Sequence, residues 1–361
     1  MEYGFTEEQA QFRDIVARFC REKAPVPVIR KLIDSESGFD QSTWKQMCDE
    51  VGLVGLNIPE SRGGAGFGPV ELGIVMEELG YSLLPSPYLS CAVLACTAVA
   101  EIEDAAIRDR LLGEMMTGAS RATLAVAPRD GNPLISLSIS EDARLSGTLD
   151  AVLDVATADR LLVIASRGNA NVLFSLDGPD GIRIESLRTM DGTRRQGRVV
   201  LDNARATALG TLDDAAVARI RNTALVALAC EMVGGARALL ESAVSYTNLR
   251  VQFGRTIGSF QAIKHRLADL LVDVELATAG ARQAAQALAA GEDAGENASL
   301  AKFVAADACM KAALECIQLH GGIGFTWEND THLWFRRAKS SEVLFGTPSF
   351  HRERMLKEMG V

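Results

Sequence analysis

The middle of the chain differs from both of its flanks, and this contrast restricts the fold more than any other feature. Six short runs rich in β-branched residues lie there, separated by Gly, Asn, Asp and Pro with no helical pattern between them. The runs cover residues 122–126, 134–139, 160–165, 172–176, 182–185 and 198–201. Strands so closely spaced pair antiparallel, since parallel pairing needs a long crossover. The pattern predicts a small antiparallel barrel or sandwich.

Residues before this region have a helical pattern. Thr6 and Gln9 have the spacing of a capping box, in which each side chain bonds the other residue's backbone N–H. Apolar residues follow at helical spacing. The expected boundaries are a stop at Pro25 and Pro27, a second helix from about Asp40, and helices again from Pro69 to about Thr117.

From Asp213 onward the pattern is helical again. An apolar stripe contains Ile263, Leu267, Leu270, Leu271, Val274 and Ala277. The Ala-rich residues 277–290 favour close helix packing, so we expect a bundle of four long helices. The fold class is therefore α+β and multi-domain. We expect an N-terminal helical domain (1–119), an antiparallel β-domain (120–206) and a C-terminal four-helix bundle (207–361).

Composition narrows the function classes. The 361 residues carry a net charge of -10 and a pI near 5.1, which disfavours nucleic acid as a partner. The seven Cys form no C-x-x-C pair, and the four His form no H-E-x-x-H motif, so no disulfide framework and no metal site are expected. Neither a signal peptide at Met1 nor a membrane span is predicted, which indicates a cytoplasmic protein.

A glycine run at residues 63–68 is compatible with two interpretations. One is a nucleotide-binding loop, but no buried strand and no βαβ unit surround it. The other is a turn between two helices, which accounts for it better.

Three stretches in the last third carry candidate chemistry: residues 250–261, 318–328 and 335–347. In the first, Arg250, Gln252 and Phe253 gather at a helix end where Gly254 turns the chain, a good clamp for an anion and a ring. In the second, Gly321 and Gly322 let backbone approach a ligand closely.

A purely structural interpretation exists for each stretch. The glycines then only turn the chain, His320 is a packing histidine, and Arg336 and Arg337 form a solvated or interface face. No single motif decides between the two interpretations.

Together and in this order, the motifs resemble the acyl-CoA dehydrogenase family over essentially the whole chain. The specific stretches are R-x-Q-F-G-x-x-I-x-x-F-Q from Arg250 and H-G-G-I-G-F-T-W-E from His320, with P-E-x-x-G-G from Pro59 in the N-terminal part. The resemblance implies an α-β-α subunit, FAD as cofactor, tetrameric assembly, and electron-transfer flavoprotein as the electron acceptor. Members remove the α-proton of an acyl-CoA thioester with a Glu while a hydride leaves the β-carbon for FAD.

That base is missing here. The family keeps it either before a Gly-Thr pair, which corresponds to Phe345, or on the first bundle helix, which corresponds to about Ala224. Neither residue takes a proton, so we assign no catalytic residue. Glu231, two turns along from Ala224, and Glu342, three residues before Phe345, are the nearest possible substitutes. Both are more simply surface or interface acids.

The resemblance also implies that each FAD lies across a dimer interface, between one subunit's β-domain wall and a clamp from the other. This chain has lost most of its wall: the matching loop is Ala127–Asn132, the segment against the flavin ring is Ala151–Leu153, and Ser349 replaces a Gln. It keeps the clamp. The candidate cofactor-binding residues are Arg250, Gln252, Phe253, Gln261, Gln318, Gly321 and Gly322, with Thr347 surviving from its own wall.

These losses predict the subunit without the base in an α2β2 acyl-CoA dehydrogenase. Its partners would be a homologous subunit that carries the Glu, an acyl-CoA substrate and electron-transfer flavoprotein. Fatty acyl and steroid side-chain thioesters are both open as substrates. The alternatives are a homotetramer with Glu342 as a relocated base, and a non-catalytic acyl-CoA-binding scaffold.

Overall fold

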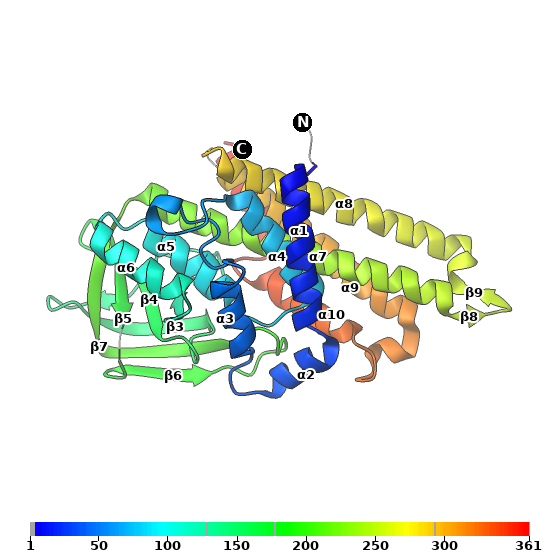
Figure 1. Ribbon diagram of the computed structural model, residues 1–361, viewed down its shortest axis with the longest axis horizontal. Coiled ribbons are helices and arrows are strands. Elements are labelled where there is room, and N and C mark those ends of the chain that lie inside the picture. Colours follow the sequence, from blue (N-terminus) through cyan, green and yellow to red (C-terminus); the bar gives the residue numbers. More distant parts are fainter. Residues whose placement is uncertain (1–3, 128, 177, 292–293, 361) are drawn as a thin grey trace.

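The computed structural model describes residues 4–127, 129–176, 178–291 and 294–360. A helical N-terminal part, a β-domain and a helical C-terminal part follow one another along the chain. In space the β-domain lies at one end of an elongated molecule and the C-terminal helices extend to the other, with the N-terminal helices in the middle and beside the β-domain (Figure 1). This is the α+β arrangement that the sequence predicts. The N-terminal residues Met1–Tyr3, on which the absence of a signal peptide was argued, and Pro128 of the predicted wall loop lie outside the described residues.

The N-terminal part begins with α1 (Glu7–Lys23), which is capped as expected: Thr6 Oγ1 accepts from Gln9 N at 3.2 Å. The first helix ends just before Pro25, as expected. The sequence did not predict α2 (Val26–Asp34), which starts directly after Pro25, because proline is tolerated in a first helical turn. The other helices are α3 (Gln41–Asp49), η1 (Glu60–Arg62), α4 (Pro69–Ser82), η2 (Tyr88–Ala95), α5 (Cys96–Ala100) and α6 (Ala105–Met116).

The β-domain contains β1 (Ala122–Leu124), β2 (Ser138–Ile139), β3 (Arg144–Leu153), β4 (Arg160–Arg167), β5 (Ala170–Leu176), β6 (Ile182–Ser186) and β7 (Gln196–Leu212). The sheet order is β1-β4-β5-β7-β3-β2, with β6 also on β7. Pairing is antiparallel except that β1 runs parallel to β4. This exception departs from the prediction, and the intervening β2 and β3 supply the crossover that it needs.

Strand β7 joins the two halves of this domain. Its first part pairs with β3 and β6, and its last part pairs with β5, from Ala206 opposite Leu176 to Leu212 opposite Asn171. The strand therefore crosses residue 206, where the sequence places the end of the β-domain. Apolar residues from both parts enclose a separate small core.

The C-terminal part contains α7 (Asp214–Leu249), β8 (Val251–Gln252), β9 (Arg255–Thr256), η3 (Ile257–Ser259), α8 (Gln261–Ala289), α9 (Gly295–His320), η4 (Gly321–Phe325), α10 (Thr331–Val343) and α11 (Pro348–Glu358). Helices α7, α8 and α9 are long, whereas α10 and α11 are short helices packed on α9. This makes the bundle less regular than the four long helices expected.

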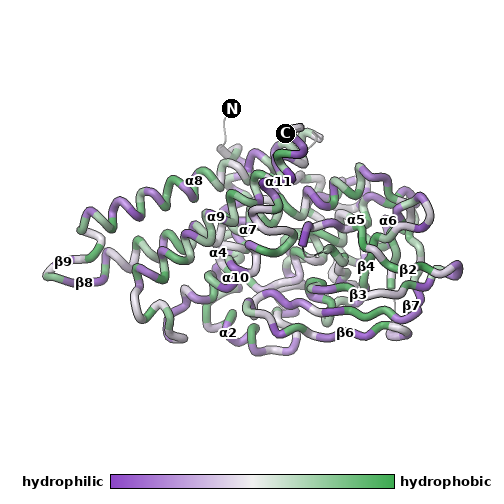
Figure 2. Tube along the Cα trace, turned by 180° about the vertical axis from the view of Figure 1, so that it is seen from behind, coloured by the Kyte–Doolittle hydropathy of each residue, from purple (hydrophilic) through white to green (hydrophobic). Residues whose placement is uncertain are grey.

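Helix α7 is the central element. It packs on α4, α8 and α9, and its most apolar window is long enough to cross a membrane, but 89% of that window is buried inside the protein. It is therefore a core helix. By contrast, α8 alternates hydrophilic and hydrophobic residues along its length (Figure 2), as befits a helix with one face on the bundle.

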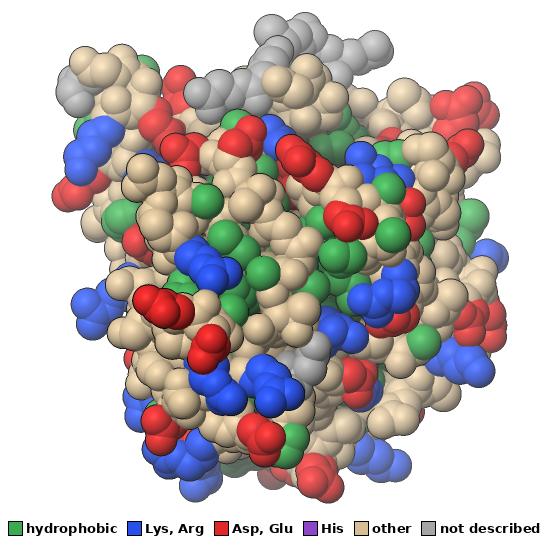
Figure 3. Space-filling view, turned by 90° about the vertical axis from the view of Figure 1, so that its left-hand side faces the viewer, with side chains coloured by type: hydrophobic (Ala, Val, Ile, Leu, Met, Phe, Trp, Pro, Cys, Tyr) green, Lys and Arg blue, Asp and Glu red, His purple; other side chains and the backbone are tan. Residues whose placement is uncertain are grey.

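The two ends of the molecule differ. At the end that faces the viewer in Figure 3, basic and acidic side chains are interspersed with hydrophobic ones. The opposite end is formed by the β8–β9 hairpin and the adjoining bundle (Figure 1). Large apolar side chains are exposed there, with Leu249 at 77%, Phe253 at 90% and Phe325 at 84%. Such exposure is typical of a contact surface for another protein.

Candidate functional site

The predicted clamp lies at the exposed end of α7. Arg250 caps the helix through its N–H to Tyr246 O (2.9 Å), and the chain then turns back as the β8–β9 hairpin. Phe253 and Gly254 both have positive φ, 56° and 76°, as a two-residue hairpin turn requires. Arg250, Gln252 and Phe253 are all exposed, so the clamp faces away from its own chain.

The glycine loop lies beside this clamp. His320, the last residue of α9, stacks on Tyr246 near the end of α7, with ring centroids 4.1 Å apart. Its Nδ1 bonds Cys316 O at 2.8 Å and the residue is buried. His320 is therefore a packing histidine that joins the ends of two helices. Gln318, Gly321 and Gly322 follow or flank it, and all three are exposed.

The remaining two candidate residues, Gln261 and Thr347, lie at the starts of different helices. Gln261 is the first residue of α8, immediately after the hairpin segment, and is exposed. Thr347 caps α11, accepting from Phe350 N at 3.3 Å. Arg352 of α11 donates to Asp307 of α9. Asp307 lies about 16 Å from Gln318 along the axis of α9. Thr347 thus does not belong to the clamp.

Phe345 is buried where the base is expected. Its side chain is 2% exposed, and its φ of 61° is unusual for a residue other than glycine. A Cβ on Gly131 would come within 3.0 Å of Phe345 Cβ, so Gly131 lies directly against it. Phe345 belongs to the main apolar core and supplies no proton acceptor.

Two buried side chains hold the Phe345 backbone in this conformation. Lys302 Nζ donates to Ser341 O, Glu342 O and Gly346 O at 3.0–3.2 Å, and His351 Nε2 lies 2.8 Å from Phe345 O. Burial lowers the pKa of Lys302 to about 7 and that of His351 to about 4. The carbonyls of the last turn of α10 are thereby satisfied without solvent.

The second base position, Ala224, is also buried, and the nearby Glu231 is not free to act as a base. Glu231 receives Arg194 Nη2 on one oxygen and Arg337 Nη1, at 2.6 Å, on the other. Burial raises its pKa, but the two guanidinium groups outweigh burial, and the pKa of Glu231 is below its usual value. A carboxylate held in this way is a weak proton acceptor.

The same two arginines tie the β-domain to the bundle. Arg337 Nε donates to Asp191 Oδ2 (2.8 Å) and Arg337 Nη2 donates to Thr193 O (3.0 Å), while Arg194 Nη1 donates to Ser341 Oγ (3.0 Å). All of these residues are buried. The solvated face that the structural interpretation gave to Arg337 is therefore wrong. Arg336 does lie near the surface, over the Trp327 ring at 4.6 Å.

One carboxyl in the cleft was not predicted. Asp154 follows β3 directly, is half-buried, and its Oδ2 accepts from Ser90 Oγ of η2 at 2.6 Å. Burial raises its pKa to about 6. A carboxyl with a raised pKa is a typical candidate base. The cavity beside it, however, is about 20 Å³, room for a single water.

Glu342, the alternative base, lies near the surface. Its carboxylate is paired with Lys339 on the same helix. Only its backbone carbonyl points inward, to Lys302 at 3.2 Å. Nothing in this arrangement presents the Glu342 carboxylate to the cleft.

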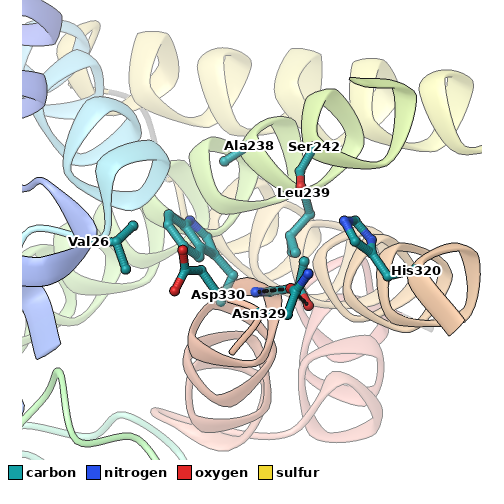
Figure 4. A pocket seen from close by; sticks show the side chains of 9 residues that line it. Val26, Ala238, Leu239, Ser242, His320, Asn329 and Asp330 are labelled. Carbon is teal, nitrogen blue, oxygen red and sulfur yellow. Dashed lines mark hydrogen bonds between the residues drawn. The ribbon is translucent and has the colours of Figure 1, made fainter. Parts of the chain in front are cut away.

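A larger cavity of about 270 Å³ lies between α7 and the start of α10 (Figure 4). Leu239 and Ser242 project from α7 toward Asn329 and Asp330, and His320 closes one side. Asp330 is paired with Arg30 at 2.8 Å, and Asn329 accepts from Thr331. Among the described residues that line the cavity, Asp330 is the only one with a carboxylate, and its pairing with Arg30 argues against a base here.

Comparison with known proteins identifies the family. The acyl-CoA dehydrogenase N-terminal domain model matches residues 6–119, and the C-terminal domain model matches residues 217–360. The chain belongs to the acyl-CoA dehydrogenase family. It is 34% identical over 355 residues to "Acyl-CoA dehydrogenase IpdE2" of Mycobacterium tuberculosis, covering 98% of each chain.

Solved structures of this family superpose closely. A variant of the "Tcur3481-Tcur3483 steroid ACAD" has a TM-score of 0.89 at 30% identity, with 98% of each chain covered. The "ChsE4-ChsE5 complex from Mycobacterium tuberculosis" has a TM-score of 0.91 at 27% identity, covering 100% of this chain and 99% of the other. Both names join two components.

FAD is the cofactor of acyl-CoA dehydrogenases, and the residues of this chain fit it only in part. The exposed clamp and glycine loop offer a guanidinium, amide groups and unhindered backbone to a ligand held outside the chain. The chain's own cleft does not fit, because Asp154, Arg194, Glu231 and Arg337 occupy it with their bonds to one another and to their neighbours. The cavity left there is far below the volume of a ligand site.

Proposed function

We propose that this chain is the subunit without the base in an α2β2 acyl-CoA dehydrogenase. It completes the FAD site of a homologous partner, which carries the catalytic Glu and removes the α-proton of the acyl-CoA. The observation that carries the proposal is an asymmetry. The clamp residues are exposed on an apolar end of the molecule, whereas both base positions are buried and apolar.

The relatives support a two-component enzyme. Two similar structures are named as paired proteins, and one of them is called a steroid ACAD. We therefore propose a thioester of a steroid-derived acid as substrate in preference to a simple fatty acyl thioester. The reduced enzyme would pass electrons to electron-transfer flavoprotein, as the resemblance implies, and we place the complex in the cytoplasm.

This chain's own chemical contribution is binding and orientation. Arg250 can neutralise a diphosphate, Gln252 and Gln318 can hydrogen-bond to it, and Phe253 can cover a ring. The bound FAD supplies the oxidation chemistry. Gly321 and Gly322 leave room for backbone approach. The catalytic base, by this proposal, comes from the partner alone.

Co-expression with a homologous dehydrogenase chain that carries the Glu tests the proposal. The purified complex is expected to hold one FAD per pair of chains and to oxidise acyl-CoA with an artificial electron acceptor. Arg250→Ala should lower flavin occupancy at least ~5-fold, since charge-assisted bonds to phosphate contribute more than 1 kcal/mol. Lys264→Ala, an exposed cation on α8, is the matched control and should leave occupancy unchanged.

The alternatives give different results. If Glu342 is a relocated base, Glu342→Gln abolishes turnover and leaves flavin bound. A scaffold shows no flavin absorbance even with the partner present. The proposal is wrong if this chain alone binds one FAD per subunit and oxidises acyl-CoA.

A further inference from the structure

The cleft between the domains of this chain is crossed by buried polar bonds. Arg194 and Asp191 lie on the β6–β7 connection, while Glu231 and Arg337 lie on α7 and α10. Arg194 bonds Glu231, and Arg337 bonds both Glu231 and Asp191. We call these four side chains the ionic joint. It contains two positive and two negative charges, and none of its members is more than 8% exposed.

The joint is well satisfied rather than strained. The Arg337 guanidinium donates through all three nitrogens, and Thr193 and Ser341 receive the bonds that the carboxylates do not. A buried charge cluster is stable only when its charges balance and its donors are bonded, and both conditions hold here. The ionic joint therefore does not need a ligand to balance its charges or to complete its hydrogen bonds.

Two further contacts narrow the cleft, while a cavity of about 390 Å³ lined by Asp191 and by residues of α2 and α10 lies on the other side of the joint. Asp154, at the end of β3, accepts from Ser90 of η2, which joins the β-domain to the N-terminal helices. On the other side Phe345 packs against the loop containing Gly131. The cavity left between these contacts is about 20 Å³.

We propose that the ionic joint takes the place that a cofactor holds between the domains, so that the cleft of this chain stays closed and binds neither flavin nor acyl-CoA. The fold of the subunit is then independent of FAD, and its only cofactor contacts are those it makes with the partner's FAD. The statement about contacts with the partner's FAD rests on the proposed function. The closed cleft itself rests on the contacts above.

The first test uses the full-length chain purified without a partner. FAD and butyryl-CoA are titrated separately by calorimetry, and thermal unfolding is measured with and without each ligand. We expect no binding at ~100 μM of either ligand and an unchanged midpoint, since only a ligand that binds the native state raises it. Binding of one FAD per chain, or a ligand-dependent rise of the midpoint, would overturn the inference.

The second test asks whether the joint keeps the cleft closed. In Glu231→Gln one carboxylate is neutralised at nearly constant volume, leaving two guanidinium groups against one charge. We expect amide exchange in residues 189–195 and 337–341 to rise at least ~10-fold, because the local opening free energy of these segments falls. The control is Glu241→Gln, an exposed residue on the same helix whose carboxylate accepts from Tyr81.

Unchanged exchange in Glu231→Gln would show that the joint does not hold the cleft. If this variant does not fold, the ligand titrations of the wild-type chain still decide the inference. Failure here is distinguishable from failure of the proposed function. Two FAD per pair of chains in an active complex would refute the closed cleft alone, whereas a flavin-free chain that completes no partner would refute the proposed function alone.

Discussion

At the scale of one residue, Arg337 shows how a buried charge is stabilised by oppositely charged neighbours. Its guanidinium lies between Asp191 and Glu231, and these two carboxylates outweigh burial and keep its pKa above the usual value. Its neighbour Arg336 instead lies over the Trp327 ring near the surface. Two adjacent arginines thus have opposite environments, and the sequence does not distinguish them.

Replacing Arg337 by Met should leave Asp191 and Glu231 with less compensation and destabilise the native state by about 3–5 kcal/mol. The matched change Arg336→Met removes a contact with an aromatic ring and should cost about 0.5–1 kcal/mol. Urea unfolding of both variants measures the difference. Equal losses would mean that Arg337 contributes through packing and not through charge.

Asp154 gives the stability a pH dependence of unusual sign. Because burial raises its folded pKa to about 6, the protonated form is favoured in the native state, and this contribution is lost as pH rises from about 4 through 6. Asp154→Asn avoids the buried charge and can still accept from Ser90. At pH 8 the variant should be more stable than wild type by at most about 3 kcal/mol.

Unfolding of wild type and Asp154→Asn at pH 4, 6 and 8 measures this effect. The advantage of the variant should shrink toward pH 4. An advantage that is constant with pH would show that Asp154 does not titrate in this range. Asp191 and Glu231 act in the opposite direction, since their lowered pKa values stabilise the native state above pH 4–5 and that contribution is lost in acid.

At the scale of elements, regular sequence patterns predicted helices and strands correctly, whereas weak patterns did not. Thr6 and Asp40 cap helices where expected, since a cap is a local interaction. Strand β3 was missed. Its sequence RLSGTLDAVL mixes polar and apolar residues without strict alternation, and its pairing with β2 and β7 makes it a strand. In the apolar stripe of α8, Leu270 and Val274 are buried but Leu271 is 47% exposed.

In the proposed function, the β8–β9 hairpin is the element on which cofactor binding depends. Gly254 has a φ of 76°, and an L-residue pays about 1–2 kcal/mol there. Gly254→Ala in the complex should therefore weaken flavin affinity by roughly 5–30-fold, measured by flavin release on dilution. Global stability should change little because the hairpin lies at the tip of the bundle.

The control for this change is Gly280→Ala in α8, where the added methyl meets open space. It should leave flavin affinity unchanged and stabilise the helix by about 0.5–1 kcal/mol. An equal loss of flavin affinity in both variants would mean that the hairpin turn has no specific role.

At the scale of the whole molecule, the apolar end and the clamp coincide. Leu249 and Phe253 are exposed at the clamp and Phe325 is exposed at the end of η4, whereas the face in Figure 3 has interspersed charges. In the proposed complex, a partner that covers this end would also bring its FAD to Arg250. Assembly and cofactor binding are therefore expected to be coupled.

Phe325→Ser tests this coupling. It removes an 84% exposed aromatic without touching the core, so the isolated chain should keep its thermal midpoint. The affinity for the partner should fall ~10-fold or more, as expected for an aromatic anchor, and flavin content of the complex should fall with it. Phe67→Ser, exposed on the N-terminal part, is the control. Loss of partner affinity in Phe67→Ser alone would place the interface elsewhere.

The sequence by itself determined the order of the three parts and the family, and it predicted the clamp residues and the replacement of both bases, because these depend on local periodicity and on residue identity at motif positions. It did not give Lys302, Asp154 or the ionic joint. Those groups are distant in sequence, and whether a charged residue is solvated or paired depends on which charges the fold brings to it. Only the tertiary structure could decide that Glu231 is held between two arginines and that the cleft behind Phe345 is closed.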